Sequence, residues 1–175
     1  MRLLAALVCA LALPAIGAST FTCTPSNNSI LFGTYNSFST TLLDSSANFV
    51  VTCVDTGGKP SQSTTLNWKA TLSNQTLRQM APSAGTDRLN YQIYTDANRS
   101  APWGDGTGGT STVTGVLNVP GSSSTTTLPI TYYGRITPVG QDVSATASGS
   151  APTNYSQVLT ITVTCTDNRG RAVTC

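Results

Sequence analysis

The sequence predicts an all-β protein folded as a sandwich of two sheets. Apolar and polar residues alternate with a period of two through most of the chain. No segment keeps a helical period over ten residues, and stretches rich in Gly, Pro, Ser and Asn separate the alternating runs at short intervals. Glu and His are absent while Ser, Thr, Asn and Gly dominate the polar positions, a composition that favours strands over helices.

The alternating runs identify the strands and their inward faces. Between Thr65 and Leu72, one face is expected to carry Leu66, Trp68, Ala70 and Leu72. The other inward sets are Phe49, Val51 and Cys53; Leu89, Tyr91 and Ile93; Val113, Leu117 and Val119; Leu128, Ile130, Tyr132 and Ile136; and Leu159, Ile161, Val163 and Cys165. Residues 155–165 are expected to form one strand with threonines outward. Pro129 faces outward and predicts an edge or a bulge, since proline donates no ladder hydrogen bond.

The first eighteen residues have the pattern of a signal peptide. Arg2 precedes an apolar run from Leu3 to Leu13, and small residues follow up to Ala18, after which we expect cleavage. The run is shorter than the about 20 apolar residues that span a bilayer, and no later stretch approaches that length. We therefore expect an exported protein without a membrane span, with residues 19–175 forming one domain.

Four cysteines follow the expected cleavage site: Cys23, Cys53, Cys165 and Cys175. An even number in an exported chain implies disulfides, and three pairings are open. We favour Cys23 with Cys53 and Cys165 with Cys175, the second pair across a hairpin around Gly170. Zinc is the rival ligand, but the chain has no His and no Cys-x-x-Cys spacing, so we expect no metal.

Charge and side-chain chemistry argue against several functions. Nine Lys and Arg balance seven Asp to a net charge of +2, which favours neither nucleic acid nor an anionic membrane as partner. Without His, the commonest general base is missing, so we expect no enzyme and no cofactor. The glycine-rich segment 104–109 precedes a strand and has no following Lys, so we interpret it as a hairpin loop, in preference to a phosphate or calcium site.

Three aromatic residues are candidates for surface recognition. Tyr94 and Tyr133 fall on the outward phase of their strands, and Trp103 falls in a loop. Exposed aromatic side chains are favoured where proteins bind ligands or other proteins.

Several motifs together resemble the spore coat protein U-like family. They are Phe32-Gly33-Thr34-Tyr35, Val51-Thr52-Cys53, Leu89-Asn90-Tyr91, Ile93-Tyr94-Thr95-Asp96, Trp103-Gly104-Asp105-Gly106-Thr107, Tyr133-Gly134-Arg135-Ile136 and Gly140-Gln141. The resemblance covers nearly all of residues 19–175. Residues 166–175 depart from it, because the family's domains generally stop near the final strand.

The resemblance implies an incomplete immunoglobulin-like sandwich of the archaic chaperone-usher pili. Such a subunit passes through the periplasm to the cell surface, with a periplasmic chaperone, an outer-membrane usher and a neighbouring pilin as partners. Its missing strand leaves a groove that a donor strand from the next subunit fills. We expect this groove between Ile30–Tyr35 and Leu159–Val163. Its expected lining includes Phe32, Leu159, Ile161 and Val163.

The position in the pilus follows from the short segment before Cys23. Only residues 19–22 are available as a donor strand, too few for the roughly ten residues that a groove requires. We therefore expect a structural and adhesive subunit that accepts a strand and donates none, at the pilus tip. One alternative is that residues 171–175 fold back and complement the groove in part. Another is a stand-alone secreted carbohydrate- or surface-binding module with a completed sandwich.

Overall fold

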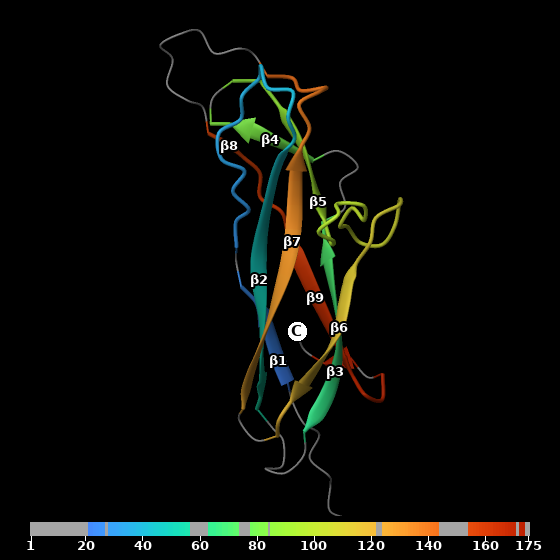
Figure 1. The fold of residues 1–175 in the computed structure, drawn as a ribbon. Helices are drawn as coiled ribbons and strands as arrows, with labels where there is room; N and C mark the ends of the chain where they lie inside the picture. The colour runs from blue at the N-terminus through green and yellow to red at the C-terminus, as the bar shows by residue number, and fades with distance from the viewer. Residues whose placement is uncertain are drawn as a thin grey trace, which may run out of the picture.

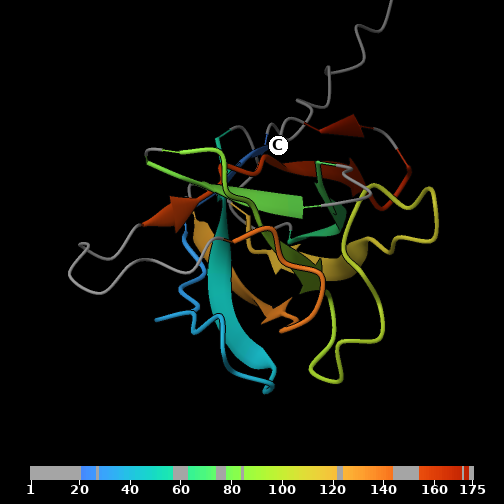
Figure 2. The same cartoon turned by 90° about the horizontal axis from the view of Figure 1, so that it is seen from above.

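The computed structural model describes residues 21–26, 28–56, 63–73, 78–83, 85–121, 124–143, 154–170 and 172–173. They form two antiparallel sheets packed face to face (Figures 1 and 2). The strands are β1 (Phe21–Pro25), β2 (Leu43–Asp55), β3 (Thr64–Leu72), β4 (Arg78–Pro82), β5 (Leu89–Tyr94), β6 (Val113–Val119), β7 (Thr125–Ile136), β8 (Tyr155–Ser156), β9 (Ile161–Asp167) and β10 (Ala172–Val173). This confirms the predicted all-β, immunoglobulin-like sandwich.

The first sheet has the strand order β1-β2-β7-β5-β4-β8, and the second has the order β10-β9-β3-β6. The long ladder of β2 with β7 runs from the pair Leu43 and Ile136 to the pair Val54 and Thr125. In the second sheet, β3 is paired on both sides, with β6 and with β9. Alternate residues of these strands point into the space between the sheets, as the period-two pattern predicts.

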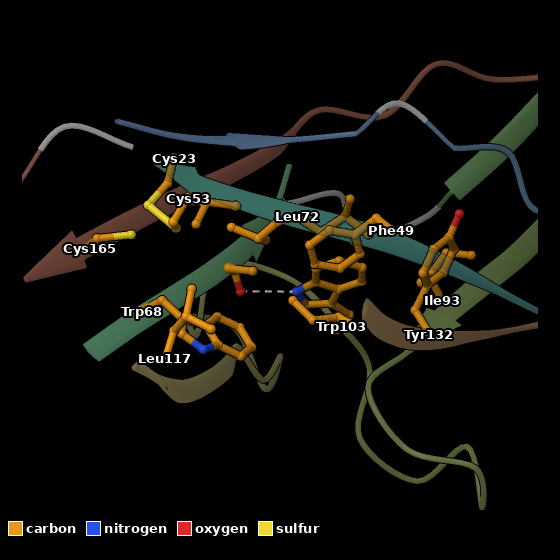
Figure 3. Packing of buried hydrophobic residues seen from close by; sticks show 14 of the residues in the cluster. Cys23, Phe49, Cys53, Trp68, Leu72, Ile93, Trp103, Leu117, Tyr132 and Cys165 are labelled. Carbon is orange, nitrogen blue, oxygen red and sulfur yellow. Dashed lines mark hydrogen bonds between the residues drawn. A yellow bond between two sulfur atoms is a disulfide. The ribbon is translucent and has the colours of Figure 1, made fainter. Parts of the chain in front are cut away.

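The core between the sheets is centred on Trp103 (Figure 3). Its ring stacks on Phe49 with centroids 5.5 Å apart and lies 5.7 Å from the ring of Tyr132. Its indole Nε1 donates a hydrogen bond of 3.2 Å to the carbonyl of Ala70 in the second sheet. Trp103 therefore bonds one sheet to the other, and it is fully buried.

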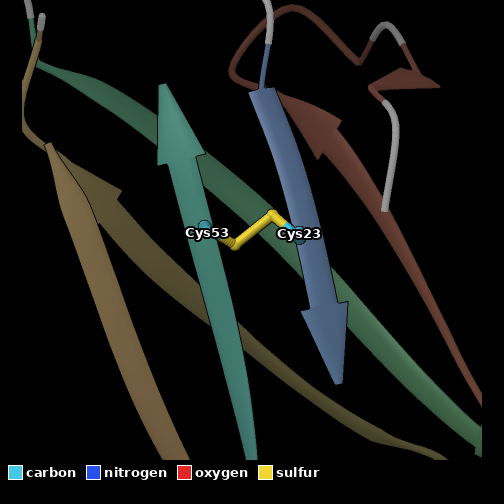
Figure 4. The surroundings of a disulfide bond; sticks show 2 residues. All are labelled: Cys23 and Cys53. Carbon is cyan, nitrogen blue, oxygen red and sulfur yellow. A yellow bond between two sulfur atoms is a disulfide. The ribbon is translucent and has the colours of Figure 1, made fainter. Parts of the chain in front are cut away.

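Cys23 and Cys53 form a disulfide between β1 and β2, where they are directly opposite in the ladder (Figure 4). This is the pairing that we favoured. Cys165 is also disulfide-bonded, whereas Cys175 lies outside the described residues, so the second pairing stays a prediction. The hairpin expected around Gly170 is present: β9 and β10 pair with Val173 opposite Cys165, and Gly170 has a φ of +74° in the turn.

Two sequence interpretations are corrected by the sheet topology. The single strand expected over residues 155–165 is divided, because β8 pairs with β4 in the first sheet and β9 pairs with β3 in the second. Residues 157–160 carry the chain between the sheets and belong to no strand. The glycine-rich segment 104–109 lies between β5 and β6, which are in different sheets, so it is not the loop of a simple hairpin.

Pro129 lies in a strand with neighbours on both sides, yet its position is locally an edge. It is opposite Val50 of β2. On the other side of β7, the pairing with β5 includes only Tyr133, Gly134 and Arg135. The missing amide of Pro129 therefore removes no hydrogen bond from that second ladder.

Candidate functional site

A groove of about 630 Å³ opens in the seam between the two sheets. One rim, called segment 25–32, is described at residues 25–26 and 28–32 and continues from β1; the other is the segment 155–161, which leads from β8 into β9. Each rim alternates as an extended chain does: Ile30 and Phe32 are partly buried while Leu31 is 80% exposed, and Leu159 is partly buried while Val158 is 93% exposed. Both rims therefore have the side-chain pattern of a strand, although residues 28–32 and 157–160 are in no strand.

Outside β1, β8 and β9, the rims are held to the sandwich by a few hydrogen bonds in place of regular ladders. On the first rim, Ser26 exchanges hydrogen bonds with Val50 of β2 through its amide and its hydroxyl. Further along, the Ser45 hydroxyl donates to the Leu31 carbonyl at 2.5 Å. On the second rim, the amide of Ser73 donates to the Thr160 carbonyl at 2.9 Å.

The floor of the groove is apolar and largely aromatic. Its residues come from both sheets and from the loop after β5: Leu72, Met80, Tyr91, Ile93, Trp103 and Tyr132. Trp103 thus has a different place from the expected surface loop. Its amide donates to the Ile93 carbonyl at 2.8 Å, which turns the loop back over the core and inserts the indole between the sheets. The prediction of Trp103 as an exposed recognition residue is wrong.

Gly134 makes room for the inward side chains of the first rim. A Cβ atom at this position would lie 2.5 Å from Phe32 Cζ and 2.6 Å from Ile30 Cδ1. The Phe32 ring also contacts Tyr91 edge to face, with centroids 5.8 Å apart. Sequence reasoning missed this role of Gly134, although a glycine inside a strand is a known signal of close approach by another part of the chain.

Tyr91 connects the floor to the second rim. Its hydroxyl donates a hydrogen bond of 2.7 Å to Oε1 of Gln157. Burial raises the pKa of Tyr91 to about 12, and the charge of nearby Arg78 opposes this shift. Arg78 itself is 1% exposed and donates to the carbonyls of Trp103 and Ser73 and to Oε1 of Gln92, so three neutral oxygens solvate this buried cation.

The expected groove residues are brought together in part. Phe32, Leu159 and Ile161 line the groove from its two rims. Val163 does not line it: its side chain is 6% exposed and packs in the core, opposite Ala70 of β3. The expectation for Val163 is therefore wrong, because its side chain is already covered within the core.

Tyr94 and Tyr133 lie opposite each other on neighbouring strands of the first sheet and are partly exposed. The guanidinium carbon of Arg99 lies 5.7 Å from the centroid of the Tyr133 ring. Arg99 and Arg135 both contact the carboxylate of Asp44, at 3.3 Å and 2.7 Å. The hydrogen bond from Arg135 holds the pKa of Asp44 below its usual range. These residues form a polar surface cluster separate from the lining of the groove.

Comparison with known proteins places this sandwich in a family of structural subunits. The family model described as Spore Coat Protein U domain matches residues 10–162. The chain therefore belongs to this family, whose members are subunits of chaperone-usher pili and not enzymes. The match ends within β9, so that β10 lies beyond it. A search of curated proteins found no match to the chain.

In the described part of the chain, no helix is long and apolar enough to cross a bilayer.

Proposed function

We propose that this pilus subunit accepts a donor strand from a neighbouring subunit in the groove between segments 25–32 and 155–161. The observation that carries the proposal is the seam itself: two extended rims with alternating side chains face each other across an apolar floor. A strand inserted there would place alternate apolar side chains over Trp103 and Tyr132, and its backbone groups would pair with the rims.

The chemistry of assembly is strand exchange, with no covalent step. We propose that a periplasmic chaperone first covers the groove, and that the next subunit's strand replaces the chaperone at the outer-membrane usher. The benefit to the subunit is burial of apolar surface, at about 25 cal/mol for each Å² removed from water, together with new ladder hydrogen bonds. The product is a fibre at the cell surface.

The experiment is a thermal-shift and affinity measurement on the purified subunit with a peptide copied from the N-terminal extension of a co-assembled subunit. Leu159→Ala should weaken peptide binding by about tenfold, since this side chain lines the groove. Leu128→Ala is the matched control, because Leu128 is also partly buried against the core but lies outside the groove lining. It should lower stability and leave the affinity unchanged.

A subunit that accumulates equally well without a chaperone, monomeric and cooperatively folded, would contradict the proposal. So would a peptide that binds both leucine variants with equal loss.

We further propose that the subunit occupies the pilus tip. The support is that Phe21 and Cys23 of β1 are already buried in the sandwich, which leaves no donor from Phe21 onward. The tip position also requires cleavage after Ala18. Mass spectrometry of the secreted protein checks the mature N-terminus, and long homopolymers of the purified subunit would contradict this position.

A second candidate function is binding of a carbohydrate or another surface by the cluster around Tyr94 and Tyr133. It is favoured by the adjacent, partly exposed rings and by Arg99 over one of them. Saturable glycan binding by the lone domain, lost in Tyr94→Ala and retained in Leu159→Ala, would support this candidate over strand acceptance.

A further inference from the structure

The seam between the sheets is open at one end of the molecule and closed at the other. At the closed end β1 lies beside β9 (Figure 4). There β10 also pairs with the edge of β9, at Thr166 and Cys165. Along the segment 155–161, the lining of the groove ends at Ile161.

The two edges of β9 differ along its length. One edge is paired with β3 over the whole strand, from Ile161 to Asp167. On the opposite edge, β10 covers Cys165 and Thr166, and within the described residues no strand pairs with β9 from Ile161 to Thr164. A donor strand entering the groove would run along residues 157–164 and would then meet β10 on the same edge.

The hairpin that contains β10 is stabilised by hydrogen bonds in its turn and by a disulfide at Cys165. In its turn, the Gly170 amide donates to the Asp167 carbonyl and the Arg169 amide donates to Oδ1 of Asp167, both at 2.9 Å. Gly170 has the left-handed φ of +74° that glycine adopts without strain. Cys165, opposite Val173, is held in a disulfide.

We propose that β10 is a stop that limits the donor strand to about eight residues, the length of edge between residue 157 and β10. Such a donor places three or four alternate side chains into the groove. The partner that fits is therefore a short extended segment with apolar residues at every second position. Chain beyond this length extends past β10 without pairing to β9. This inference rests on the proposed strand-accepting function.

The test uses blocked peptides of alternating valine and threonine with five, eight and eleven residues. For the full chain, the dissociation constant should fall by about tenfold from five to eight residues and change by less than about twofold from eight to eleven. A variant that ends at Gly170 and carries Cys165→Ser lacks β10. For this variant, the dissociation constant of the eleven-residue peptide should be about tenfold lower than that of the eight-residue peptide.

Hydrogen exchange on the full chain gives an independent measurement if the shortened variant does not fold. The eleven-residue peptide should slow exchange in residues 157–164 and leave Cys165 and Thr166 unchanged, because β10 already protects them. An equal gain in affinity from the eight-residue to the eleven-residue peptide in both proteins would overturn the proposed role of β10. New protection of Cys165 and Thr166 from exchange would overturn it as well. Failure of all three peptides to bind would instead count against the strand-accepting function.

Discussion

The substitution Gly134→Ala tests how the first rim is seated. The added Cβ would lie 2.5 Å and 2.7 Å from two atoms of the Phe32 ring and 2.6 Å from Ile30 Cδ1, where ordinary contacts exceed about 3.4 Å. Both side chains must then move off the sheet. Overpacking of this kind costs about 1 to 3 kcal/mol, and we expect Gly134→Ala to lower the free energy of unfolding by that amount.

A second protein, in which the rim side chains above Gly134 are shortened, separates the effect of this contact from the general effect of replacing a glycine. In a protein that carries Ile30→Ala and Phe32→Ala, the space above Gly134 is free. There Gly134→Ala should be neutral or stabilising by about 0.4 to 1 kcal/mol, because alanine restricts the unfolded chain. Urea unfolding of the four proteins, followed by tryptophan fluorescence, gives the interaction energy between the sites.

Gly115→Ala is the matched control for this cycle. Its Cβ would lie 2.6 Å from Trp68 Cζ2, in the other sheet and away from Phe32. Gly115→Ala should therefore destabilise both backgrounds equally. An equal cost of Gly134→Ala in both backgrounds would refute the contact with the rim as the origin of the effect.

Three further perturbations have expected outcomes. Cys53→Ser removes a disulfide that closes a loop of 30 residues, and should lower the free energy of unfolding by about 4 kcal/mol by the chain-entropy model. Urea unfolding of this variant beside the unsubstituted protein, both without a reductant, checks this, and equal midpoints would contradict it. The pKa of Tyr91 is about 12 in the folded protein and about 10 in the unfolded chain. The contribution of Tyr91 to stability is therefore fully present below pH 10 and is lost as the pH rises towards 12. Tyr91→Phe should flatten this alkaline decline in pH-dependent melting temperatures. The pKa of Asp44 is lower in the folded protein than its unfolded value of about 4, so the stabilisation by Asp44 is present above that unfolded value and is lost as the pH falls through the folded value. Asp44→Asn should therefore weaken the loss of stability at acid pH in the same assay.

The strands themselves were predictable from the sequence because alternation depends only on which face meets the core. Leu66, Trp68, Ala70 and Leu72 are all buried in β3, as their spacing predicts. The pattern does not tell which sheet a strand joins. Residues 155–165 keep one phase throughout, yet the segment leaves the first sheet after Ser156 and enters the second at Ile161.

The site was less predictable because it depends on contacts between distant segments. Trp103 was expected to be exposed, since a loop residue has no period to place it. Its burial follows from the hydrogen bond to Ala70 and the stacking on Phe49, which pair residues that are far apart in the chain. The burial of Val163 likewise follows from its place opposite Ala70 of β3, in a core assembled from distant segments. No local pattern contains that information.

The distribution of these contacts explains how a sandwich with an open seam keeps its fold. At the closed end the Cys23–Cys53 disulfide joins β1 to β2 within the first sheet, the β9–β10 hairpin extends the edge of the second sheet, and β1 contacts β9 across the seam. At the open end the rims are tied by isolated hydrogen bonds, such as that between Tyr91 and Gln157, and by Phe32 packed over Gly134. Local opening costs least where few ladder bonds must break, so the rims should separate while the closed end stays intact. Under the proposed function, a donor strand would need to displace only these few contacts, and the ladders that it would form with both rims would offset their loss.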